Sequence, residues 1–253
     1  MEDLRQTDLQ NLDKDYLHID PLRQTYRESI VQPPEARKAL ILHKVALLVI
    51  DLQYLDAAPG YGVFADVISN NAVPVQAQEY YFKRLDHVVL PNVRRIQDAF
   101  RDLKLEVIHT RIQSLTQDGR DRSVGHQRLG LHAPPGSKEA EFLPEVAPKG
   151  DEIVINKTAS GVFNASNLEY ILRNMLIDSL YVCGVYTNEC VSTTVRDACD
   201  RGFHTTLVND ACATVTPELH NATIATLRDR YSRVMTTDEV IKEIRLAGKN
   251  ESR

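Results

Sequence analysis

The sequence predicts an α/β fold built on a mainly parallel β-sheet, and three observations carry this prediction. From residue 44 onward, apolar runs of strand length alternate with amphipathic stretches of helix length, which is typical of βαβ units. The run over residues 46–53 is apolar almost throughout, as expected of a parallel strand covered on both faces. The chain has 253 residues, of which 43% are hydrophobic, so it can bury one large core without disulfides or metals.

The elements follow from local patterns along the chain. The buried strand over residues 46–53 is interrupted near its end by Asp51. Residues 54–81 are long for a strand-to-helix connection and contain Pro59-Gly60, so we interpret them as a loop that shapes a pocket. Apolar periodicity predicts helices over residues 91–103, 167–175 and 217–231. Short apolar or β-branched runs predict strands over residues 105–110, 152–157, 179–185 and 205–209.

The segment from Val182 to Cys190 is an apolar run that turns through Gly184 and delivers Cys190 to the start of a helix. Asn188 is a plausible N-cap of that helix. The helix is indicated by apolar residues on one face and a terminating glycine, namely Val191, Val195, Ala198 and Gly202. The helix dipole is expected to lower the pKa of the thiol and favour the nucleophilic thiolate. A cysteine in this position is also commonly inert and buried, so other residues must decide.

Two further polar residues close predicted strands. Asp51 ends the first strand, and Lys157 ends the β-branched run over residues 152–157. Ligands of open α/β sheets bind at the carboxyl ends of the strands, so Asp51, Lys157 and Cys190 are expected to meet there, at adjacent strand ends. A proton acceptor, a fixed positive charge and a nucleophile are what acyl transfer through a thioester requires. The alternative is three unrelated polar residues at strand ends.

These residues resemble the isochorismatase-like cysteine hydrolase superfamily over roughly residues 44–245. The similarity lies in the motif around Asp51-Leu52-Gln53, in Lys157 followed by Ser160 and Phe163, and in the run from Gly184 to Val191. The resemblance implies a three-layer α/β/α fold and a catalytic triad of Asp51, Lys157 and Cys190. It also implies a cis peptide between Val185 and Tyr186, and an oxyanion hole formed by the N–H groups of Tyr186 and Cys190.

Within this superfamily the chain looks most similar to enzymes that release ammonia from linear ureides or carbamoyl compounds, such as biuret, triuret, ureidoacrylate or N-carbamoyl amino acids. Hydrolysis of maleamate, nicotinamide or N-carbamoylsarcosine is the alternative. The predicted substrate contacts are polar or aromatic residues near the expected site, namely Gln53, Arg111, Phe163, Asn164 and Asn188. Arg111 has an equally good alternative as a partner of a surface acid. Tyr186 stands where many relatives carry a small residue, so it is expected to reshape the pocket.

No histidine lies between His43 and His87, so the histidine-containing metal site of related nicotinamidases is not expected, and we predict a site without metal or cofactor. His109 is expected to be structural. The charged residues of the following loop are expected to be mostly solvated, namely Asp121, Arg122, His126 and Arg128.

The expected partner is a small-molecule amide substrate. A net charge of −5 gives no general reason to expect nucleic acid or an anionic membrane as partner, and no apolar stretch approaches the roughly 20 residues of a membrane-spanning helix. Four cysteines without a signal-peptide pattern indicate free thiols and a cytoplasmic protein. The resemblance implies a homo-oligomer, a dimer or a tetramer.

Residues 1–40 are charged and lack a sustained apolar period, so we predict an N-terminal extension before a hydrolase domain over residues 41–253. The extension either wraps the domain or a neighbouring subunit, or is a partly disordered tail. Two other functions stay open at this point: a non-catalytic binding module on the same fold, and a redox-sensing thiol at Cys190.

Overall fold

The computed structural model describes residue 40, residues 44–65 and residues 73–251. The predicted extension over residues 1–40 therefore lies almost wholly outside the described residues. Six parallel strands form one sheet in the order β3-β2-β1-β4-β5-β6. Their bounds are β1 Val45–Ile50, β2 Glu106–Ile112, β3 Ile153–Lys157, β4 Ser179–Val185, β5 His204–Ala213 and β6 Arg233–Met235.

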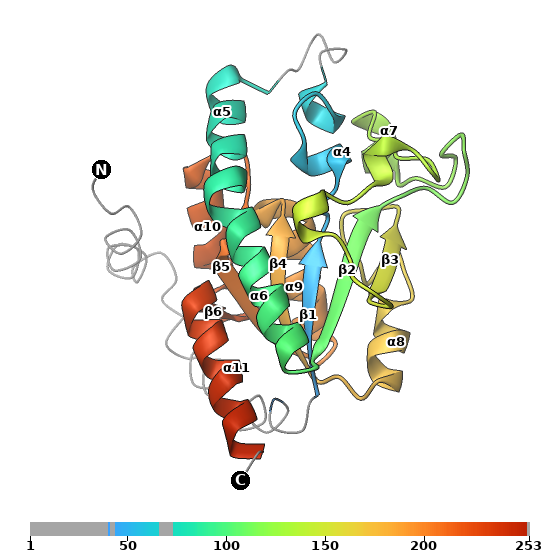
Figure 1. Cartoon of the computed structure of the whole chain (residues 1–253). Coiled ribbons are helices and arrows are strands. Elements are labelled where there is room, and N and C mark those ends of the chain that lie inside the picture. Colours follow the sequence, from blue (N-terminus) through green and yellow to red (C-terminus); the bar gives the residue numbers. More distant parts are fainter. Residues whose placement is uncertain (1–39, 41–43, 66–72, 252–253) are drawn as a thin grey trace.

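Helices cover both faces of this sheet (Figure 1). The helices α6 and α11 lie on one face, and α9 lies on the other, which confirms the predicted three-layer α/β/α architecture. None of the described helices is long and apolar enough to cross a membrane. The helix bounds are α4 Tyr54–Ala57, α5 Val75–Arg84, α6 Leu90–Asp102, α7 Val124–Arg128, α8 Leu168–Asn174, α9 Ser192–Asp200, α10 Pro217–Leu227 and α11 Thr237–Glu251.

The two central strands explain the apolar runs of the sequence. Every residue of β1 and of β4 is buried, because helices pack on both faces of the sheet. β1 and β4 are neighbours, while the chain continues from β1 to β2 on one side and from β4 to β5 on the other. Open α/β sheets bind ligands at the carboxyl ends of the strands where the strand order reverses in this way, here at the ends of β1 and β4.

Four of the sequence-based assignments need correction. Residues 54–81 are not one long loop, because α4, a 3₁₀ turn and the start of α5 lie within them. A π-helical turn, Leu85–Val89, joins α5 to α6, so helix begins well before residue 91. The helix predicted over residues 217–231 ends at Leu227. β6 and α11 follow it, and neither was predicted.

Gly184 allows β1 and β4 to approach closely. Its φ is 118°, and a Cβ built at this position would lie 2.0 Å from the carbonyl oxygen of Ile50. The register between β4 and β5 also shifts between Val182 and Gly184. A side chain at Gly184 would therefore push β4 away from β1.

We expect Gly184→Ala to lower the free energy of unfolding by about 3 kcal/mol or more, because it combines a left-handed backbone with a clash against backbone atoms. Gly202→Ala is the matched control: its φ is 81°, but nothing lies within 4 Å of its added Cβ. The control should cost only about 1 kcal/mol. Urea unfolding of both variants tests this, and equal losses would contradict the account of Gly184.

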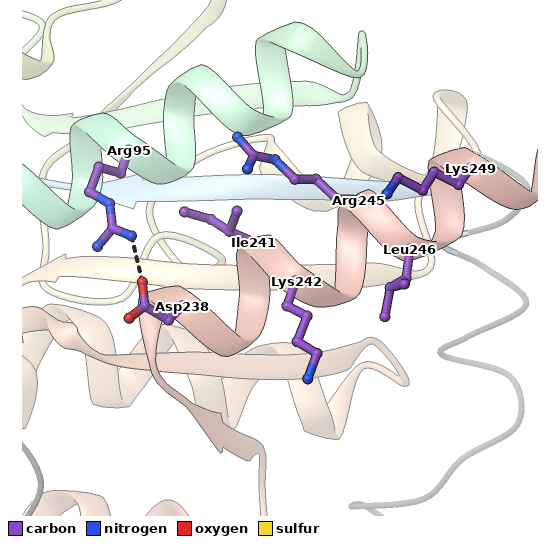
Figure 2. A pocket seen from close by; sticks show the side chains of 7 residues that line it. All are labelled: Arg95, Asp238, Ile241, Lys242, Arg245, Leu246 and Lys249. Atoms are coloured by element: carbon purple, nitrogen blue, oxygen red, sulfur yellow. Dashed lines mark hydrogen bonds and ion pairs between the residues drawn. The ribbon is translucent and has the colours of Figure 1, made fainter.

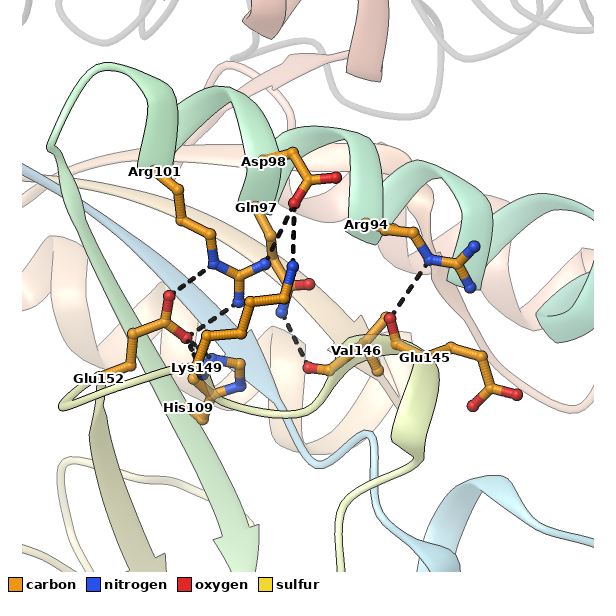
Figure 3. Close-up of polar contacts among 9 residues, drawn as sticks. All are labelled: Arg94, Gln97, Asp98, Arg101, His109, Glu145, Val146, Lys149 and Glu152. Carbon is orange, nitrogen blue, oxygen red and sulfur yellow. Dashed lines mark hydrogen bonds and ion pairs between the residues drawn. The ribbon is translucent and has the colours of Figure 1, made fainter.

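A polar network fixes the start of β3 (Figure 3). Arg101 of α6 donates to Glu152 from Nε at 2.6 Å and from a second nitrogen at 3.0 Å. The ring nitrogen Nε2 of buried His109 lies 2.9 Å from Oε2 of Glu152, so His109 has the structural contact predicted for it. Burial acts to raise the pKa of Glu152, but the hydrogen bonds from Arg101, Lys149 N–H and His109 outweigh it and lower the pKa to about 2.

This network predicts an acid-sensitive stability. Because the pKa of Glu152 is lower in the folded chain than in the unfolded chain, its stabilisation is complete above the unfolded value of about 4.3 and is lost as the pH falls toward about 2. Glu152→Gln should therefore have a lower free energy of unfolding than the native chain near neutral pH. This difference should disappear in acid. Thermal unfolding at several pH values checks this, with Glu169→Gln, a half-exposed pair with Arg201, as control. A deficit independent of pH would refute it.

Candidate active site

Asp51 is the first residue after β1, and the end of β2 holds it in place. Its φ is 53°, a left-handed value that is uncommon for a residue other than glycine and that often marks functional sites. Its N–H donates to the carbonyl oxygen of Thr110 at 3.1 Å, and the Thr110 hydroxyl donates to its Oδ1 at 2.8 Å. Asp51 and Thr110 are both fully buried. The second carboxylate oxygen, Oδ2, is thereby directed to another partner.

That partner is Lys157, the last residue of β3. Its Nζ lies 2.7 Å from Oδ2 of Asp51, donates to the carbonyl oxygen of Ala159 at 3.0 Å, and donates to Sγ of Cys190 at 3.4 Å. These three acceptors match the three N–H donors of an ammonium group. Burial acts to lower the pKa of Lys157, but Asp51 and Cys190 raise it, so the group is a fixed positive charge.

The prediction of adjacent strand ends is wrong in one respect. β2 separates β3 from β1 in the sheet, so Lys157 reaches Asp51 across the end of β2. Thr110, which the sequence analysis did not single out, lies at that strand end and bonds Asp51.

Cys190 lies in a π-helical turn, Thr187–Val191, between β4 and α9. The peptide between Val185 and Tyr186 is cis, as the resemblance implied. The carbonyl oxygen of Tyr186 accepts hydrogen bonds from Glu189 N–H at 3.0 Å and from Val191 N–H at 3.3 Å, the residues on either side of Cys190. These two N–H groups are therefore engaged within the turn, whereas a first-turn N–H group without such a partner can stabilise an oxyanion. The oxyanion hole at Tyr186 and Cys190 stays a prediction.

The expectation of a lowered thiol pKa is wrong. Burial raises the pKa of Cys190 well above its usual value. Lys157 acts to lower this pKa, but its effect is smaller than that of burial, and the charge of Asp51 raises the pKa further. Cys190 is only 3% exposed. The resting site therefore holds a neutral thiol beside a carboxylate–ammonium pair, and the thiol needs a base to become nucleophilic.

Three of the predicted substrate contacts have protein partners instead. The Gln53 amide donates to the carbonyl oxygens of Ile112 and Glu139 and accepts from Ile112 N–H, so the amide joins α4 to β2. Arg111 alternates with Thr110 along β2 and so points to the other face of the sheet, where it donates to Asn156 Oδ1 at 2.8 Å and to a backbone carbonyl. Asn188 is not an N-cap, and its Oδ1 accepts from the Thr214 hydroxyl.

The other two predicted contacts lie beside α9. Asn164 donates to Asp197 at 3.1 Å and accepts from Arg201 at 3.3 Å, so its amide is also occupied by protein groups. Phe163 is buried, and its ring lies 5.8 Å from that of Phe203. Contact of Phe163 with substrate stays a prediction.

The structure adds an acid that the sequence analysis missed. Asp56 of α4 is only 4% exposed, and its backbone carbonyl accepts the hydroxyl groups of Tyr81 at 2.7 Å and Tyr186 at 3.0 Å. Burial, then the charge of Asp51, raises the pKa of Asp56 well above its usual value despite the attraction of Lys157. A carboxyl five residues after Asp51 was a visible signal, but it fell inside the segment interpreted as a loop.

The ring of Tyr186 packs against two aromatic side chains. Its ring centroid lies 5.3 Å from that of Tyr81 and 6.4 Å from that of Phe64. Together with the bond from its hydroxyl to the Asp56 carbonyl, this packing ties the turn that carries Cys190 to the segment after β1.

His126 of α7 is a second buried group that the sequence analysis placed in solvent. It is 4% exposed, and its Nδ1 has no partner among the described residues. Burial, reinforced by the charge of Lys157, lowers the pKa of His126 to about 4, so the ring is neutral near pH 7. The charge of Asp51 opposes this lowering of the pKa.

A separate hollow of about 400 Å³ lies between α6 and α11 (Figure 2). Arg95 of α6 and Asp238 of α11 form an ion pair at its rim. None of its lining residues belongs to the triad or to the turns that carry it. Among the described residues there is also no group of three or more His, Cys, Asp or Glu side chains arranged to hold a metal ion.

The sequence of the chain is similar to those of known proteins. Residues 45–239 match the isochorismatase domain family. The chain is 29% identical over 162 residues to the isochorismatase family protein YwoC of Bacillus subtilis (strain 168), which covers 62% of this chain and 84% of that protein. It is also 29% identical over 162 residues to the N-carbamoylsarcosine amidase of Arthrobacter sp, with 61% of this chain and 60% of that protein covered.

Solved structures agree on the fold. A cysteine hydrolase from Pseudomonas syringae pv. phaseolicola 1448A superposes with a TM-score of 0.64 at 23% identity, covering 81% of this chain and 94% of that chain. The family match spans more than half of the chain and includes the strands β1 and β4 and the residues Asp51, Lys157 and Cys190. The chain therefore belongs to the isochorismatase family and is a hydrolase.

Proposed function

We propose that this protein is a metal-independent cysteine amidohydrolase that releases ammonia from a small linear ureide or carbamoyl compound through a thioester on Cys190. The observation that carries the proposal is the buried cluster of Asp51, Lys157 and Cys190, in which Nζ of Lys157 contacts both Oδ2 of Asp51 and Sγ of Cys190. The related N-carbamoylsarcosine amidase, whose name describes cleavage of a carbamoyl amide, supports this reaction class.

The resting charges suit such a reaction. The thiol is neutral and Lys157 is positive, and Nζ of Lys157 lies between Oδ2 of Asp51 and Sγ of Cys190 in contact with both. Asp51 takes the thiol proton as Sγ attacks the substrate carbonyl carbon, so negative charge moves from the carboxylate toward the substrate oxygen. Lys157 remains protonated and holds both partners in register. Backbone N–H groups of Tyr186 and Cys190 receive the oxyanion, a contribution typically worth about 100-fold in rate or more.

The remaining steps return every proton. The carbon–nitrogen bond breaks, the leaving nitrogen takes the proton from Asp51, and ammonia departs, which leaves an acyl thioester on Cys190. Asp51 then removes a proton from a water molecule, whose oxygen attacks the thioester carbon. The carbon–sulfur bond breaks and the thiol regains its proton. The net reaction consumes one amide and one water and yields one acid and ammonia.

The test is ammonia release from a panel of small amides in the presence of a chelator. The panel contains biuret, triuret, ureidoacrylate, N-carbamoylsarcosine, maleamate and nicotinamide, and the matched control is Cys190→Ser. We expect chelator-insensitive release from a ureide by the native chain alone. Release from maleamate or nicotinamide only would replace the substrate assignment, and silence on the whole panel would favour a binding module.

A further inference from the structure

Asp56 has an unsatisfied carboxyl oxygen inside the protein. Its Oδ2 is buried and has no hydrogen-bond partner among the described residues. Buried polar atoms are nearly always paired, and an unpaired one in a native structure calls for an explanation. The backbone of Asp56 is held firmly, because its carbonyl oxygen accepts two tyrosine hydroxyls. The backbone of Asp56 is therefore held in place, and one oxygen of its carboxyl group is left for a partner that the described residues do not supply.

The missing partner belongs to the active site. The charge of Asp51 affects the pKa of Asp56, and the charge of Asp56 affects the pKa of Lys157 and Cys190, so Asp56 belongs to the same buried group of charges as the triad. The hydroxyl of Tyr186, four residues before Cys190, also reaches the backbone of Asp56. A substrate carbonyl attacked by Sγ of Cys190 would bring its neighbouring atoms within reach of Asp56.

The charge around Asp56 selects the kind of group that can bind there. In addition to burial, the charges of Asp51 and Glu189 raise the pKa of Asp56, and Lys157, which already pairs with Asp51, lowers it. Burial raises the pKa of Asp56 well above its usual value and also raises the pKa of Glu189, which favours the uncharged form of each carboxyl group. A substrate carboxylate would add an uncompensated negative charge in this place, which low-dielectric surroundings disfavour strongly.

We propose that the carboxyl group of Asp56 is a specificity-determining group, which forms a hydrogen bond through its unpaired oxygen with a second, uncharged amide of the substrate next to the amide that is cleaved. A protonated carboxyl offers one O–H donor and one acceptor oxygen. A primary amide offers one N–H donor and one acceptor oxygen on the same edge, so the two groups are complementary. The inference rests on the proposed amidohydrolase function and narrows its substrates to uncharged ureides of the biuret type.

The test compares Asp56→Leu with the native chain on three substrates. Biuret carries a second uncharged amide, butyramide has none, and N-carbamoylglycine carries a carboxylate instead. Loss of this hydrogen bond should lower kcat/KM for biuret by about 100-fold, because the substrate amide is then desolvated without a partner. The kcat/KM for butyramide should change by less than about threefold, because butyramide has no second amide that could lose a partner. The native chain should prefer biuret to N-carbamoylglycine by at least about tenfold.

Two controls separate recognition from folding. Asp56→Asn keeps one donor and one acceptor, so it should retain kcat/KM for biuret within about tenfold. The rate at which iodoacetamide alkylates Cys190 should be unchanged in Asp56→Leu if the triad is intact, and its melting temperature should not fall, because leucine removes an unpaired buried polar atom.

Four results overturn the inference. An equal loss on biuret and butyramide would show a structural role, and native kcat/KM for biuret in Asp56→Leu would show no role. A native preference for N-carbamoylglycine would reject the substrate class. If the native chain hydrolyses no amide at all, the proposed function fails and this inference with it, which distinguishes that failure from the other three.

Discussion

Asp51→Asn is expected to lower kcat for amide hydrolysis by about 1,000-fold, because the side chain then cannot carry protons between the thiol, the leaving nitrogen and water. The same variant should leave Cys190 at least as reactive toward iodoacetamide. Asp51 raises the pKa of the Cys190 thiol, so its neutralisation favours the thiolate beside Lys157. Ammonia release and the alkylation rate, measured on one preparation, separate the two effects.

This divergence distinguishes a proton carrier from a residue that merely supports the fold. A structural role would lower both rates together. Thr110→Val is the matched control, because it removes the hydroxyl that donates to Oδ1 of Asp51 but keeps the carboxylate. It should lower kcat far less than Asp51→Asn. Hydrolysis by Asp51→Asn at the native rate would exclude Asp51 as the base.

Lys157→Met is expected to lower the free energy of unfolding by about 3–5 kcal/mol, because it leaves the carboxylate of Asp51 buried without its counter-ion. It should also abolish detectable hydrolysis and slow alkylation of Cys190, since Lys157 acts to lower the pKa of the thiol. Urea unfolding measures the first effect, and iodoacetamide labelling measures the last.

The double variant Asp51→Asn with Lys157→Met makes this prediction specific. It removes both charges, so it should recover much of the lost stability but none of the activity. If the double variant were no more stable than Lys157→Met alone, the buried pair would not be the source of the loss.

The sequence predicted the part of the fold that depends on uninterrupted burial. β1 and β4 are buried along their whole length, so their apolar runs were unambiguous. β6 has only three residues, all half-buried, and carries no such run. The segment after β1 was misjudged because α4 is a four-residue helix and too short to show a period.

In the active site, too, the sequence predicted the features that follow from the parallel sheet and missed those that depend on packing. Strand ends placed Asp51, Lys157 and Cys190 correctly at one edge, because that edge is a property of parallel sheets. The protein partners of Arg111 were not predicted, because the direction of a strand side chain depends on register and one position along β2 reverses its face. The raised thiol pKa of Cys190 and the buried carboxyl of Asp56 depend on how deeply the turns are packed, which no local pattern records.

The most direct measurement is the mass of the enzyme during turnover. The protein is mixed with biuret and quenched in acid within the first turnovers, and the peptide that contains Cys190 is weighed. We predict an adduct equal to the substrate minus ammonia on Cys190, and none on Cys183, Cys199 or Cys212. Steady ammonia release without any adduct, together with undiminished release by Cys190→Ala, would contradict the thioester mechanism.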